Sequence, residues 1–169
     1  MTRAHADPFA PAPPRGSQSF LPMDEAAAPR LRRRPVQSYP QGGRMVLVVD
    51  DNELVVKTVE AILHRLGHAT LEAYCGEGAL AWLEKGHHPD LAIVDVNMPR
   101  MSAEQILLRL RALRPNLPVL FITGWVNDQV LALATDHPAV AVLAKPFGVS
   151  ELDAQLQVLA PQPGDSPLH

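Results

Sequence analysis

Two hydrophobic patterns alternate along residues 45–160. The first is a short, nearly uninterrupted apolar run, which is typical of a strand covered on both faces of a parallel sheet. The second is a longer segment with apolar residues at three- and four-residue spacing, which predicts a helix with one buried face. The predicted strands are residues 45–49, 69–74, 91–94, 119–122 and 140–143.

Residues that commonly cap helices mark the ends of the second pattern. Gly67 is predicted to end the first helix as its C′ residue, and Ser102 and Ser150 are predicted to be N-caps. The predicted helices are residues 52–66, 76–85, 102–113, 127–135 and 150–159. Five strands that alternate with five helices predict an α/β fold, a doubly wound five-stranded parallel sheet of (βα)5 type with helices on both faces.

The alternating patterns predict one domain over residues 44–160, flanked by two segments of different composition. Residues 1–43 hold eight of the seventeen prolines and almost no apolar periodicity, so we predict a disordered Pro/Arg-rich tail. We interpret Arg30-Leu-Arg-Arg-Arg34 within it as a solvated charge run, with a patch for polyanions or membrane surfaces as the alternative. Residues 161–169 are predicted to be a disordered C-terminal tail, and Met45 is a candidate alternative translation start.

The N-terminal segment and the predicted domain carry opposite net charges. Residues 1–44 contain seven arginines and three acidic residues, a net charge of +4, whereas residues 45–169 contain eight basic and fifteen acidic residues, a net charge of −7. An acidic domain is unsuited to sequence-independent nucleic-acid binding, so no direct DNA binding is expected. The single cysteine, Cys75, excludes an internal disulfide, and no apolar run approaches the length of a membrane span. We therefore expect a cytoplasmic protein.

Polar residues of complementary chemistry follow four of the predicted strands. Because the carboxyl ends of parallel strands meet at one edge of a sheet, these side chains are expected to converge. Three carboxylates packed together repel one another, and Mg²⁺, which prefers carboxylate oxygens, relieves that repulsion. A hydroxyl group, a glycine N–H and an ammonium group beside such an ion would stabilise a phosphoryl group in transfer. The residues are Asp50, Asp51, Asp95, Thr123, Gly124 and Lys145.

Four motifs at these strand ends resemble those of the receiver domains of two-component response regulators. They follow the order of the family, with 44 residues from Asp51 to Asp95, 28 more to Thr123 and 22 more to Lys145. The resemblance covers about residues 44–160 and implies a CheY-like, flavodoxin-like fold with strand order 2-1-3-4-5. The motifs are Val49-Asp50-Asp51, Asp95-Val-Asn-Met-Pro-Arg-Met101, Phe121-Ile-Thr-Gly124 and Lys145-Pro-Phe147.

The resemblance implies a role for each site residue. Asp95 would be the phosphoacceptor, taking a phosphoryl group from a phosphohistidine on a sensor histidine kinase or a histidine phosphotransfer protein. Asp51, Asp95 and the backbone carbonyl of Asn97 would bind Mg²⁺ directly, with Asp50 acting through water, and Mn²⁺ is expected to be able to replace Mg²⁺. Thr123 and Lys145 would bind the phosphoryl oxygens.

The resemblance also implies a cis bond between Lys145 and Pro146 and a phosphorylation-dependent surface. Movement of Thr123 toward the phosphoryl group would reshape the face formed by the fourth helix, fifth strand and fifth helix. We expect this face to bind an unknown output protein, and a homodimer through the same face is an alternative partner arrangement.

Five positions are expected to make this chain behave differently from a typical receiver domain. Val142 stands where many receivers have a mobile aromatic ring, and valine is stiff at χ1. Ala103 replaces a common glycine, which would cost about 1 kcal/mol if the backbone there needs a positive φ. Asn97, Met98 and Trp125 are expected to border the site entrance, where Trp125 would either shield the acyl phosphate from water or contact a partner.

The leading hypothesis from the sequence is a stand-alone, single-domain response regulator that is not an enzyme acting on other substrates. It would signal by phosphorylation-controlled protein–protein interaction or pass its phosphoryl group along a phosphorelay. A receiver-like adaptor that acts without phosphorylation remains as the alternative. A Mg²⁺-dependent aspartyl-phosphate phosphohydrolase is disfavoured, because such enzymes typically have a second acid where this chain has Asn97.

Overall fold

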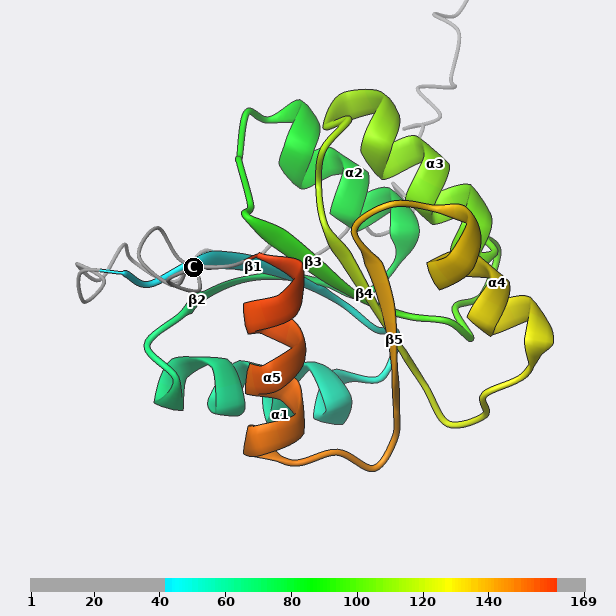
Figure 1. Cartoon of the computed structure of the whole chain (residues 1–169). Helices are drawn as coiled ribbons and strands as arrows, with labels where there is room; N and C mark the ends of the chain where they lie inside the picture. Colours follow the sequence, from blue (N-terminus) through cyan, green and yellow to red (C-terminus); the bar gives the residue numbers. More distant parts are fainter. Residues whose placement is uncertain (1–41, 161–169) are drawn as a thin grey trace, which may run out of the picture.

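A computed structural model of the protein describes residues 42–160, which form one five-stranded sheet with helices on both faces (Figure 1). The predicted disorder of residues 1–43 and 161–169 lies outside the described residues, apart from Gly42 and Gly43. The strands are β1 Met45–Val49, β2 Ala69–Ala73, β3 Leu91–Asp95, β4 Val119–Thr123 and β5 Val140–Ala144. The helices are α1 Glu53–Arg65, α2 Gly76–Glu84, α3 Ala103–Leu113, α4 Asp128–Asp136 and α5 Val149–Leu159.

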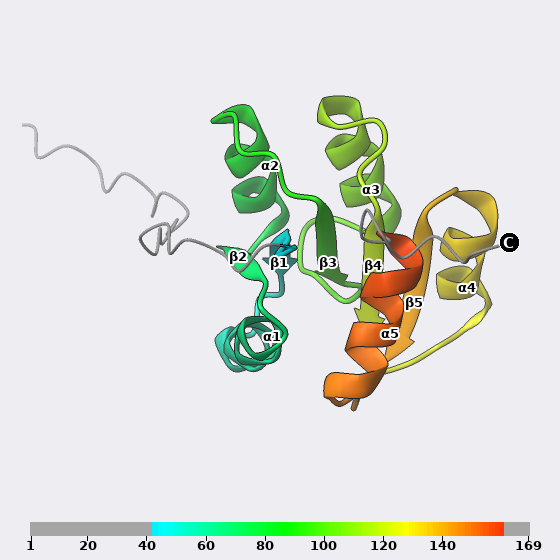
Figure 2. The same ribbon diagram turned by 60° about the vertical axis from the view of Figure 1, so that its left-hand side comes forward.

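All paired strands are parallel, and their order is β2-β1-β3-β4-β5, so the predicted fold class and strand order are confirmed. Helices α1 and α5 cover one face of the sheet, while α2 and α3 cover the other (Figure 2). Helix α4 lies beside the edge strand β5. Among the described residues, no helix is long and apolar enough to cross a membrane.

The continuous apolar runs arise because the sheet is buried on both faces. Successive strand residues point to opposite faces, so Leu47 packs with α2 and α3, whereas its neighbours Val46 and Val48 pack with α1 and α5. The same division applies to β4, where Phe121 and Ile122 are both fully buried in different clusters. Each interior strand therefore needs apolar residues at every position, which is the pattern found in the sequence.

The predicted N-cap Ser102 is confirmed, whereas the predicted N-cap Ser150 is wrong. The hydroxyl of Ser102 accepts a hydrogen bond from the N–H of Gln105 at 3.2 Å. Helix α5 instead begins at Val149, with Gly148 as its N-cap. The carboxylate of Glu151 accepts a hydrogen bond from the N–H of Gly148 at 3.0 Å, and this contact fixes the N-cap two residues before Ser150.

Two glycines end helices α1 and α2 in the same way. Gly67 has a φ of 85° and Gly86 a φ of 81°. In each case the glycine N–H and the N–H of the next residue donate hydrogen bonds back to carbonyl groups of the last helical turn. This is the pattern of a Schellman motif, and the predicted role of Gly67 as a C′ residue is therefore confirmed.

The expected strain at Ala103 is absent, because Ala103 is the first residue of α3 and does not have a positive φ. The turn after β3 instead places the positive φ at Arg100, with a value of 68°. The loop reaches Ser102 in an extended conformation, so alanine at position 103 causes no backbone strain.

Replacing Gly86 tests the role of the left-handed backbone. Gly86→Ala is expected to lower the free energy of unfolding by about 1–2 kcal/mol, because a Cβ is strained at positive φ. A Cβ at this position would meet no atom within 4 Å, so crowding does not contribute. Gly86→Asn should lose less, because asparagine tolerates this conformation. Urea denaturation of the three proteins measures the difference, and equal losses in both variants would contradict the backbone explanation.

Candidate functional site

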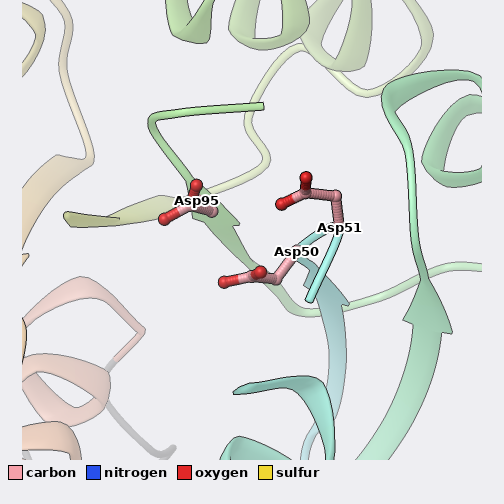
Figure 3. A group of neighbouring side chains, drawn as sticks. All are labelled: Asp50, Asp51 and Asp95. Carbon is pink, nitrogen blue, oxygen red and sulfur yellow. The ribbon is translucent and has the colours of Figure 1, made fainter. Parts of the chain in front are cut away.

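Three carboxylates meet at the carboxyl edge of the sheet (Figure 3). Asp50 and Asp51 follow β1, and Asp95 is the last residue of β3, which pairs with β1. One oxygen from each carboxylate lies within 4.8 Å of the others. Asp50 is 1% exposed and Asp95 is 6% exposed, whereas Asp51 is open to solvent. The predicted convergence of these residues is therefore present in the structure.

Each buried carboxylate is held by an N–H two residues later in the chain. An oxygen of Asp50 accepts a hydrogen bond from the N–H of Asn52 at 2.8 Å. An oxygen of Asp95 accepts one from the N–H of Asn97 at 2.9 Å. These are Asx-turn contacts, for which the aspartates themselves are the signal in the sequence, because the donors are backbone N–H groups.

The ammonium group of Lys145 joins two of the carboxylates. Its Nζ lies 2.9 Å from Oδ2 of Asp50 and 2.8 Å from Oδ1 of Asp95. Burial lowers the pKa of Lys145, but the hydrogen bonds to Asp95 and Asp50 raise it by more, so the pKa lies above its ordinary value. Lys145 is therefore protonated at neutral pH, and its bond to Pro146 is cis, as the family resemblance implied.

The donor set fits a hard divalent cation. Three carboxyl groups and one ammonium, with a formal net charge of −2, lie within a space of a few ångströms. The carboxylate of Asp51 makes no hydrogen bond or ion pair with any other residue between 42 and 160. Carboxylate oxygens are the ligands that Mg²⁺ prefers, so the charge and chemistry of this cluster suit such an ion.

The hydroxyl of Thr123 is completely buried and is engaged by the loop after β4. It donates a hydrogen bond to the carbonyl of Trp125 at 2.9 Å and accepts one from the N–H of Trp125 at 3.1 Å. The carbonyl of Thr123 also accepts a hydrogen bond from the N–H of Lys145 at 2.7 Å. Thr123 therefore connects the lysine of the site to the exposed loop, a connection that the sequence did not predict.

The remaining predicted residues divide into exposed and buried groups. Trp125 is 76% exposed, and Asn97 and Gly124 are also exposed, so all three can border the entrance. Met98 is buried in the core cluster that also contains residues of α2 and α3, and its place at the entrance stays a prediction. Val142 is half-buried against the same cluster.

Comparisons with known proteins agree with this geometry. The family described as the response regulator receiver domain matches residues 46–157. The chain is 35% identical over 117 residues to the virulence transcriptional regulatory protein PhoP of Salmonella typhimurium, covering 68% of this chain and 50% of that protein. It is 32% identical over 121 residues to the probable transcriptional regulatory protein TcrX of Mycobacterium tuberculosis, covering 70% of this chain and 50% of that protein.

A sensor kinase and a solved structure also match. The chain is 33% identical over 115 residues to the sensor kinase CckA of Brucella abortus, covering 66% of this chain and 12% of that protein. The chemotaxis protein CheY4 of Vibrio cholerae superposes with a TM-score of 0.63 at 28% identity, covering 69% of this chain and 98% of that structure. The chain thus spans about half the length of the curated regulators it matches.

Thermal unfolding tests whether the carboxylate cluster binds Mg²⁺. Mg²⁺ is expected to raise the Tm, because an ion bound only by the folded protein stabilises it by about 2.7 kcal/mol at 100 times its Kd. Asp51→Asn should remove most of this rise, since it deletes the unpaired charge. Glu84→Gln, an exposed substitution on α2, is the matched control and should respond as the unaltered protein does. An undiminished rise in Asp51→Asn would show that the ion binds elsewhere.

Proposed function

This chain belongs to the response regulator receiver domain family, and on that premise we propose that Asp95 accepts a phosphoryl group from a phosphohistidine. The donor would be a sensor histidine kinase or a histidine phosphotransfer protein. The observation that supports this best is that the ammonium of Lys145 contacts both Asp50 and Asp95. The solvent-exposed carboxylate of Asp51 lies beside them.

The chemistry at Asp95 follows from its hydrogen bonds. A carboxylate oxygen of Asp95 forms a bond to phosphorus as the bond from phosphorus to the donor nitrogen breaks, and the bonding electrons leave with that nitrogen. Lys145 is positioned to balance negative charge on the transferred group, because its ammonium already contacts Asp95. Mg²⁺ or Mn²⁺, held by Asp51, Asp95 and the carbonyl of Asn97 with Asp50 acting through water, would stabilise the phosphoryl oxygens.

The response to phosphorylation would begin at Thr123. The hydroxyl of Thr123 donates a hydrogen bond to the carbonyl of Trp125 and accepts one from its N–H. To donate to a phosphoryl oxygen instead, the hydroxyl must break its hydrogen bond to that carbonyl. That change releases the loop before α4 and alters the surface of α4, β5 and α5. We propose that this surface binds an output protein in a phosphorylation-dependent way, with phosphorelay transfer and self-association as further uses.

One observation supports a phosphorylation-independent adaptor as the second candidate. Val142 on β5 carries no aromatic ring, so the ring movement that accompanies phosphorylation in many receivers cannot occur there. If the surface does not respond to Asp95, the domain would bind its partner constitutively. The two candidates differ in whether partner binding changes when Asp95 is phosphorylated.

Intact mass spectrometry tests the phosphoacceptor directly. The full chain is incubated with acetyl phosphate or phosphoramidate, with and without Mg²⁺. A gain of one phosphoryl group is expected only with Mg²⁺, and Asp95→Ala should show none, because the attacking carboxylate is absent. Asp128→Ala, which removes an exposed acid on α4, should be modified normally. Failure of the folded protein with both small donors and with a phosphohistidine protein would reject the proposal in favour of the adaptor.

Tryptophan fluorescence tests the movement of the loop after β4. Phosphorylation should change the emission, because Thr123 must release the backbone of Trp125 while Trp82 stays buried in the core. Trp125→Phe should abolish the change without preventing phosphorylation. Thr123→Val should be phosphorylated more slowly and show no change. A change that persists in Trp125→Phe would place the movement elsewhere.

A further inference from the structure

A hollow of about 490 Å³ lies between the start of α3 and helix α4. Helix α3 covers the face of the sheet opposite α5 (Figure 2). The apolar lining of the hollow includes Val96 and Ala103 from the start of α3 and its preceding loop, and Val130 and Leu133 from α4. We call this space the α3–α4 hollow. Val96 directly follows Asp95, so the hollow begins next to the carboxylate edge of the sheet.

The hollow exists because α4 is packed loosely. Val130 is the one residue of α4 that is buried, and Leu133 and Ala134 are packed only in part against the core. Helix α3, by comparison, buries four residues. Ala132 and Leu133 of α4 are only partly buried and line the hollow, where a further apolar side chain could complete their packing.

The rim of the hollow is acidic. Glu104 on α3 and Asp136 on α4 line it, and both are exposed. Neither carboxylate forms an ion pair within residues 42–160. The nearby guanidinium of Arg111 donates a hydrogen bond to the carbonyl of Pro138, and His137, the remaining titratable group of the lining, carries at most one positive charge. An occupant with an apolar side chain flanked by cations would match this surface.

We propose that the occupant is the segment Arg30-Leu-Arg-Arg-Arg34 of this same chain, which lies outside the described residues. Its leucine matches the apolar lining, and its four arginines match the two rim carboxylates and the acidic domain around them. The sequence separates these charges, with +4 over residues 1–44 and −7 over residues 45–169. Residues 30–34 are therefore the part of the chain that complements the hollow in both charge and apolar character.

The connection is long enough for this contact. Arg44 fixes the point where the N-terminal segment meets the domain, because its N–H donates to Nδ1 of His68 and its Nη1 donates to the carbonyl of Leu156. Nine residues lie between Arg34 and Arg44, and the ten residue steps from one to the other span about 33 Å when extended. Three strand spacings, about 14 Å, separate β1 from β5. A strand of five residues adds about 16 Å between the amino edge at Arg44 and the carboxyl edge where the hollow begins. The diagonal of about 21 Å is shorter than the extended connection. The attachment is intramolecular, so a high effective concentration favours even weak binding.

Limited proteolysis of the full chain tests this contact without any dependence on phosphorylation. Trypsin cleaves after Arg30, Arg32 and Arg33, and also after Arg15, which lies outside the segment and serves as an internal reference. At low ionic strength, cleavage within the segment should be slow relative to cleavage after Arg15. The double variant Glu104→Gln/Asp136→Asn should raise that ratio by about fivefold, because it removes the rim charges.

A matched double variant separates docking from general charge effects. Glu77→Gln/Glu84→Gln removes two exposed acids from α2 and should leave the cleavage ratio unchanged. Equal ratios in all three proteins, or an equal increase in both double variants, would overturn the proposal. Protection that weakens on dilution of the protein would assign the contact to a second copy of the chain, which also overturns the intramolecular assignment.

Discussion

The ion pairs of Lys145 with Asp50 and Asp95 are the contact on which the arrangement of the site depends. Two nearly fully buried carboxylates a few ångströms apart repel each other, and each would be costly to bury without a cation. The ammonium of Lys145 contacts both and so links the ends of β1, β3 and β5 across the sheet. Because those strands are far apart in sequence, this link forms only when the whole sheet has assembled.

The same ion pairs leave the negative charge of the site only partly balanced. One ammonium cannot balance three carboxylates, and the carboxylate of Asp51 lies exposed to solvent. A hard cation and a phosphoryl group together would supply the missing partners, one for the carboxylates and one for Lys145 and Thr123. The hydroxyl of Thr123 is hydrogen-bonded to the backbone of Trp125. A phosphoryl group in the site would therefore compete with the loop backbone for this hydroxyl.

The two faces of the sheet differ in how firmly they are covered. Helices α1 and α5 pack closely over one face, and Leu152 and Leu156 of α5 are fully buried. On the other face α4 buries only Val130 and leaves the α3–α4 hollow beside it. A loosely packed helix next to the Thr123 loop is suited to changing position, because little buried apolar area is lost when it moves.

The sequence by itself determined the strands and the convergence of the site, because burial on both faces demands continuous apolar runs and parallel strands bring their carboxyl ends to one edge. The strand order followed from the family resemblance of the motifs. Local chemistry also identified Ser102 and Gly67 as caps. The start of α5 was missed because the reach of Glu151 to Gly148 outweighs a serine two residues later. The hydrogen bonds between Thr123 and Trp125 are local, but the residue types alone do not single them out. The burial of Met98 and the α3–α4 hollow depend on contacts between distant segments, so only the tertiary structure decided them.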